Sequence, residues 1–146
     1  MSTTAKIEIF DRICVSLFDK LYSEFPVPVD INMQDVVMSV VPEDASFDST
    51  WDALSVSDGV VSFLADEGFL KYSGTMIMGV PNFTEVRLTM KGLAVLGYIP
   101  FEKKEPPIST IRKMVQGGMK DAGKETIRNV VSQVFSLVLT TSVTAG

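Results

Sequence analysis

Two stretches decide the fold of this chain, Val60-Val-Ser-Phe-Leu-Ala-Asp-Glu-Gly-Phe-Leu70 and Leu88-Thr-Met-Lys-Gly-Leu-Ala-Val-Leu96. In the first, apolar side chains recur at helical spacing up to Gly68, a residue type that commonly ends a helix in the left-handed conformation. In the second, Thr89 is a suitable N-cap for a helix over residues 90–96. These two stretches therefore predict two helices, which are separated by a segment without helical spacing of its apolar residues.

The segment between the two helices predicts a β-hairpin. Residues 69–72, 75–80 and 83–88 have strand-like composition, and the last of these alternates charged with apolar side chains. The dipeptides Ser73-Gly74 and Pro81-Asn82 separate the three segments and are typical of turns.

Upstream of the first stretch, the pattern is mainly helical. Apolar side chains at steps of three and four predict a helix over residues 5–25 that ends before a proline. The elements expected after it are an edge strand at 27–31, a helix over 33–41 capped by Asn32, a short helix anchored by Trp51 and Leu54, and a helix over 58–67 capped by Ser57.

This order of elements resembles a winged helix-turn-helix domain of bacterial type over about residues 5–98. Residues 60–70 look like the third helix of that fold entering its wing. Residues 88–92 are similar to the phrase Leu-Thr-x-Lys-Gly that often follows the second wing strand. The resemblance implies that helix 58–67 enters the major groove of DNA, or that the domain contacts proteins instead. The expected fold is mostly α with a small β-hairpin.

The charge distribution argues against reading DNA through helix 58–67. From Leu21 to Leu70 the chain has ten acidic residues and no lysine or arginine, and residues 1–100 carry a net charge of −8. Duplex DNA is bound largely through cations that neutralise its phosphates. We therefore expect no nucleic-acid binding through the usual recognition helix.

The composition also excludes several kinds of catalytic site. The chain has no histidine and one cysteine, so a Cys/His zinc site or a Ser-His-Asp triad cannot be built. No glycine-rich nucleotide-binding motif is present. We expect a protein that is not an enzyme and has no cofactor or metal. Because Glu8 and Asp11 interrupt the place of a signal peptide's apolar run, we expect it to be cytoplasmic.

A second unit follows the domain at 1–98. Residues 99–107 form a charged linker with two prolines, and residues 108–146 predict a long amphipathic helix with a short tail, which can kink at Gly117-Gly118. Its apolar side, here called the association face, comprises Val115, Gly118, Ala122, Ile127, Val130, Val131, Val134, Phe135 and Val138. Its basic stripe comprises Arg112, Lys120, Lys124 and Arg128 at helical spacing.

Covering this apolar side is worth on the order of 10 kcal/mol, so the helix must pack somewhere. Three destinations are open: its own domain, other copies of the chain, or a membrane. The leading hypothesis is a protein-interaction or assembly module whose C-terminal helix self-associates or docks a protein partner. The alternatives are a winged-helix transcriptional regulator and a membrane-active protein that inserts its C-terminal segment. Within the hairpin, Met76, Ile77 and Met78 are expected to be partly buried, and an exposed contact with a protein partner is the alternative.

Overall fold

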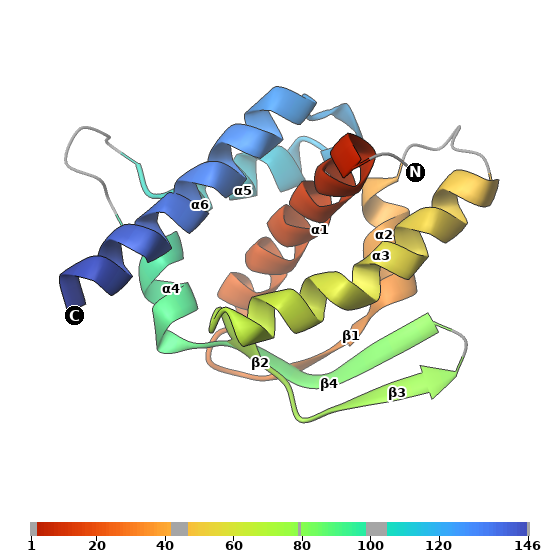
Figure 1. The fold of residues 1–146 in the computed structure, drawn as a ribbon, viewed down its shortest axis with the longest axis horizontal. Helices are drawn as coiled ribbons and strands as arrows, with labels where there is room; N and C mark the ends of the chain where they lie inside the picture. The colour runs from red at the N-terminus through yellow and green to blue at the C-terminus, as the bar shows by residue number, and fades with distance from the viewer. Residues whose placement is uncertain (1–2, 42–46, 79, 99–104, 146) are drawn as a thin grey trace.

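Helix α1 (Thr3–Glu24) is the element around which the others pack (Figure 1). Its consecutive residues Ile13, Cys14 and Val15 are all fully buried. Successive helical side chains point about 100° apart, so a buried run of three covers much more than one stripe of the helix. Helix α1 is therefore enclosed on more than one side, whereas the sequence pattern predicted a single buried face.

The computed structural model describes residues 3–41, 47–78, 80–98 and 105–145. After α1 the elements are β1 (Val29–Asn32), α2 (Met33–Val40), α3 (Phe47–Asp66), β2 (Leu70–Lys71), β3 (Gly74–Met78), β4 (Val80–Leu88), α4 (Met90–Leu96), α5 (Pro107–Gln116), the 3₁₀ turn η1 (Met119–Asp121) and α6 (Lys124–Ala145). The expectation of a mostly helical fold with a small antiparallel sheet is confirmed.

The predicted helix ends are set by local side-chain and backbone bonds. The Asn32 side chain accepts a hydrogen bond from the Asp35 N–H at the start of α2, and Thr89 does the same for Gly92 at the start of α4. Gly68 has a φ of +83°, and the following Phe69 N–H donates to the Leu64 carbonyl. These contacts confirm both predicted caps and the predicted glycine terminator.

Helix α3 differs from the prediction, because one helix replaces the two that were expected. Ser57, the predicted cap of the second helix, lies inside α3 and is fully buried. Its hydroxyl donates to the Leu54 carbonyl at 2.6 Å. This bond satisfies the buried hydroxyl within a continuous helix, so Ser57 needs no cap role.

The sheet is antiparallel, with strand order β1-β4-β2, and β3 also pairs with β4. The predicted turn at Pro81-Asn82 is wrong, because both residues belong to β4 and pair with Ile77 and Met76 of β3. Leu70 and Leu88 face each other on the core side, so their neighbours Lys71 and Arg87 face each other on the outer side.

The C-terminal segment folds back onto the rest of the chain (Figure 1). Helices α5 and α6 both pack on α1, and α6 also packs on α4. Instead of one long helix, α5 ends at Gln116 and Gly118 takes a φ of +94° before η1. One cluster of buried residues includes members of both predicted units, although the linker residues 99–104 lie outside the described part of the chain. No helix in the described ranges is long and apolar enough to cross a lipid bilayer.

Candidate functional site

The predicted association face lies inside the chain's own core. Five members on α6 (Ile127, Val130, Val131, Val134 and Val138) are at most 7% exposed. Val115, Ala122 and Phe135 are partly buried against the same cluster, and Gly118 is half-buried in the connection between α5 and α6. Of the three destinations that the sequence left open, the structure shows packing on the same chain, whereas the leading hypothesis placed this face against another molecule.

Aromatic rings carry much of this packing. The Phe135 ring of α6 lies 5.4 Å from that of Phe69, 6.0 Å from that of Phe10 and 6.2 Å from that of Phe63. Rings at such separations attract one another beyond their burial of apolar surface. Phe135 thus joins α6 to α1, to α3 and to the start of the hairpin.

The predicted basic stripe is divided by the break between α5 and α6. Arg112 on α5 lies over the Tyr22 ring, 5.1 Å from its centroid, in a cation–π contact. Arg128 on α6 donates to the Asp11 carboxylate at 2.7 Å. Lys124 lines an open cavity of about 310 Å³ beside Arg128, and the Lys120 side chain lies outside the described structure. Two of the four cations therefore fasten the C-terminal helices to α1.

The ion pair between Asp11 and Arg128 is set against the protein interior. The Asp11 side chain is only 4% exposed, and its burial raises the pKa of this carboxyl although Arg128 favours the charged form. One turn away, burial also raises the pKa of the Cys14 thiol well above its ordinary value. Cys14 is therefore a packed core residue, as expected, and it has no thiolate character.

The raised pKa of Asp11 predicts an unusual pH dependence. The folded state holds the Asp11 proton more tightly than the unfolded state, so stability from this group is present below its unfolded pKa and lost as pH rises through the folded pKa. We expect the free energy of unfolding of the wild type, relative to that of Asp11→Asn, to fall as pH rises through this window. Urea titrations at a series of pH values measure the difference, with the exposed Asp35→Asn as control. A difference that rises with pH would contradict the assignment.

The hairpin segment of Met76, Ile77 and Met78, for which partial burial was expected and a contact was the alternative, is described only in part. All three residues belong to β3, and the Met76 side chain is 57% exposed. The side chains of Ile77 and Met78 lie outside the described residues. An exposed methionine at this strand is compatible with a contact, and the other two positions stay a prediction.

The outward face of α3 combines acidic and aromatic side chains. Helical spacing places Trp51, Asp52, Asp58 and Asp66 within about 120° of arc, and all four are exposed. Trp51 is 58% exposed and Phe63, at the edge of this face, is 43% exposed. We call these five residues the α3 face. The sequence predicted its charge but treated Trp51 as a buried anchor, because the two-helix interpretation misplaced it.

A second feature, the cross-strand pair of Lys71 and Arg87, was not predicted. Both cations were expected in strands, but not opposite each other. The available signal is the mirrored order of Leu70-Lys71 and Arg87-Leu88 about the hairpin, which brings like residues together once the two strands are paired in register.

The described residues offer no group of three or more carboxylate or thiolate side chains arranged to hold a metal ion. The two candidate surfaces are the acidic α3 face and the basic pair of Lys71 and Arg87 on β2 and β4. Both lie on a core to which the C-terminal helices contribute. Searches of protein-family models, of curated proteins and of solved structures find no significant match to this chain.

Proposed function

We propose that this chain is a protein-interaction module without enzymatic activity, in which a winged-helix arrangement presents the α3 face to a basic segment of a partner protein. The order of α1, β1, α2, α3 and the hairpin, with β4 between β1 and β2 in the sheet, supports the winged-helix arrangement. In that arrangement α3 takes the place of the recognition helix.

The observation that carries the proposal is the chemistry of the α3 face. The five residues that define it are three carboxylates and two aromatic rings, and the α3 sequence contains no lysine or arginine. Such a face repels a phosphate backbone and attracts lysine and arginine side chains. Exposed Trp51 adds a ring that can stack on an arginine guanidinium of the partner.

The centre of the α3 face consists of small residues that permit close approach. Ser55 and Gly59 lie between the carboxylates at helical spacing, and both are exposed. A Cβ added at Gly59 would meet no atom within 4 Å. A partner segment can therefore reach the helix itself while its cations meet the carboxylates on either side.

Trp51 gives a direct test, because it is the only tryptophan in the chain. The full-length protein is titrated at low salt with a peptide rich in lysine and arginine, and Trp51 fluorescence reports the binding. We expect saturable binding that salt weakens, and about tenfold weaker binding (near 1.4 kcal/mol) for Asp52→Lys with Asp58→Lys. The matched control is Glu24→Lys with Glu125→Lys, which reverses two exposed carboxylates on α1 and α6 and should change the affinity little.

Two outcomes would contradict the proposal. Equal weakening in both double variants would show that only net charge matters and that the α3 face is not a site. Tight binding of duplex DNA, lost on changing α3, would favour the second hypothesis, a transcriptional regulator. A mobility-shift titration of the same variants at low salt measures that alternative.

A further inference from the structure

The cross-strand pair of Lys71 and Arg87 places two cations side by side. The two residues are direct partners in the β2–β4 ladder, and both are exposed, whereas Leu70 and Leu88 beside them are buried. Like charges directly opposite each other destabilise an antiparallel pair. Among the ion pairs of the described residues, none neutralises Lys71 or Arg87. The fold therefore keeps an electrostatic cost at this position.

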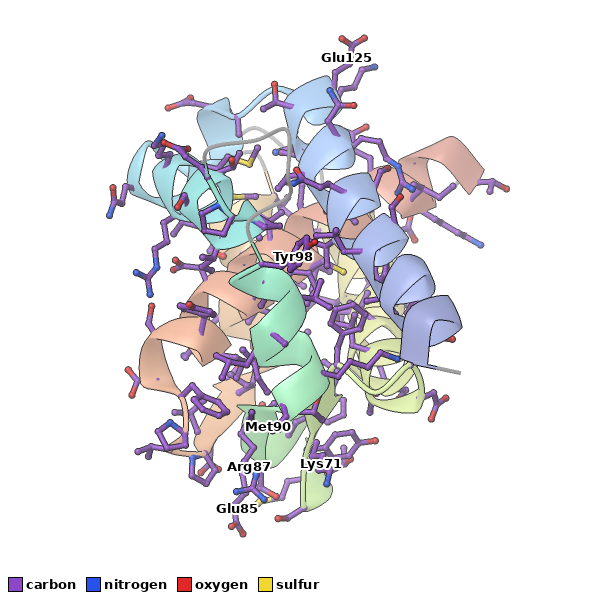
Figure 2. All side chains as sticks on the ribbon, turned by 90° about the vertical axis from the view of Figure 1, so that its left-hand side faces the viewer. Lys71, Glu85, Arg87, Met90, Tyr98 and Glu125 are labelled. Carbon is purple, nitrogen blue, oxygen red and sulfur yellow. The ribbon has the colours of Figure 1, made fainter. Side chains whose placement is uncertain are left out.

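An open cavity adjoins the pair. It has a volume of about 480 Å³, and Lys71 and Arg87 line it together with Lys91 and Thr89. Its remaining walls are the apolar side chains of Phe25, Pro26, Leu88 and Met90. Figure 2 shows Lys71, Arg87 and Met90 gathered at one end of the molecule. Met90 is 72% exposed, although its side chain is apolar.

The other charged groups near the pair make one of the two adjoining cavities more favourable for an anion than the other. Lys91 donates from its ammonium to the Glu67 carbonyl at 3.1 Å, which holds a third positive charge beside the cavity. Glu85 lines a separate cavity of about 290 Å³ on which Lys71 and Arg87 also border. The carboxylate of Glu85 repels an anion from that second cavity. This repulsion favours the side of Phe25 and Met90 for an anion.

We propose that this cavity binds a small phosphate monoester whose organic part is apolar or aromatic. A phosphate monoester carries a charge of about −1.5 to −2 and three acceptor oxygens at neutral pH. Lys71 and Arg87 together match that charge and Lys91 adds a third cation beside them, whereas a single carboxylate would leave one cation of the cross-strand pair unpaired. The arginine fork can bind two phosphate oxygens and the lysine a third. The apolar walls then cover the organic part.

This inference goes beyond the proposed function, because it uses β2, β4 and α4 and not the α3 face. The two can fail independently: loss of peptide binding to α3 would leave the phosphate site untouched, and the reverse also holds.

The test titrates the full-length protein with phenyl phosphate and follows backbone amide shifts by NMR. We expect shifts centred on β2, β4 and α4, at least about tenfold weaker binding for Lys71→Met or Arg87→Met, and no measurable binding for the double variant. Lys20→Met is the matched control, because it removes one exposed cation on α1, outside the cavity, and should leave the affinity unchanged.

Two further probes separate a built site from simple charge attraction. Inorganic phosphate should bind more weakly than phenyl phosphate, and Met90→Ser should weaken phenyl phosphate without affecting inorganic phosphate. Removing either cation of the pair should also raise the melting temperature, which confirms that the variants fold. The proposal is overturned if the Lys20 variant loses as much affinity as the others, if phenyl phosphate binds no better than inorganic phosphate, or if duplex DNA binds Lys71 and Arg87 more tightly than phenyl phosphate does.

Discussion

Replacing Phe69 with alanine should lower the free energy of unfolding by about 3–5 kcal/mol. The Phe69 side chain is fully buried, and its ring lies 5.6 Å from that of Phe18 on α1 and 5.4 Å from that of Phe135 on α6. The substitution removes a ring that joins the hairpin to both helices and leaves a cavity between them. Since small proteins are stable by only about 5–15 kcal/mol, the variant should lose a large share of its stability.

Phe63→Ala is the matched control for this prediction. It removes the same side chain, and Phe63 also contacts Phe10 and Phe135, but Phe63 is 43% exposed. Its loss should cost about 1–2 kcal/mol. Urea unfolding of the two variants beside the wild type measures both values. Equal losses would contradict the placement of Phe69 at the centre of the core.

The second large effect is expected at Gly92, where alanine should cost about 2–3 kcal/mol. A Cβ at Gly92 would lie 2.3 Å from the Phe69 carbonyl oxygen, closer than any van der Waals contact. That carbonyl cannot move away freely, because it accepts a hydrogen bond from the Thr89 N–H at 3.0 Å. The substitution must therefore either shift α4 away from the hairpin or break this bond.

Gly59→Ala separates this steric effect from helix propensity. Gly59 is also helical, but a Cβ there meets no neighbouring atom. Alanine should therefore stabilise the protein by about 0.5–1 kcal/mol, through its higher helix propensity. Thermal unfolding of both variants gives the comparison. If Gly92→Ala also raised the melting temperature, the close approach of α4 to Phe69 would be incorrect.

Features that depend on neighbouring residues could be predicted from the sequence. Asn32 and Thr89 begin helices because their side chains bond a backbone N–H three residues on, and Gly68 ends one because it adopts a positive φ. The strand pattern around Leu88 followed from its alternation with charged side chains. In each case the physical cause lies within a few residues, so the local pattern contains it.

Features that depend on distant residues could not be predicted in the same way. From the sequence, Ser57 is a plausible N-cap. In the folded chain it is buried inside α3, and its hydroxyl donates to the Leu54 carbonyl of the same helix. The pairing of Asp11 with Arg128 joins residues 117 positions apart. The apolar side of α6 predicted that this face is buried. Its pattern is the same whether it packs on α1 or on another molecule, so the packing partner could not be predicted.

Arg12 holds the fold-back of the C-terminal segment at a place where the sequence offered no signal. Its guanidinium donates to the carbonyl of Met119, the first residue of η1, at 2.8 Å and to that of Ala122, which follows η1, at 3.4 Å. These bonds satisfy backbone acceptors where the chain turns between α5 and α6. A long-range contact between a side chain and backbone carbonyls leaves no periodicity to detect.

Ring-to-ring nuclear Overhauser effects test most directly whether α6 completes the core of its own chain. Spectra of a uniformly labelled sample should show contacts from Phe135 to Phe69 and to Phe10. In an equal mixture of labelled and unlabelled protein, an isotope-filtered experiment selects contacts between different molecules. We expect these contacts to be absent from the filtered spectrum. If they appear there, α6 packs on another copy of the chain and not on its own core.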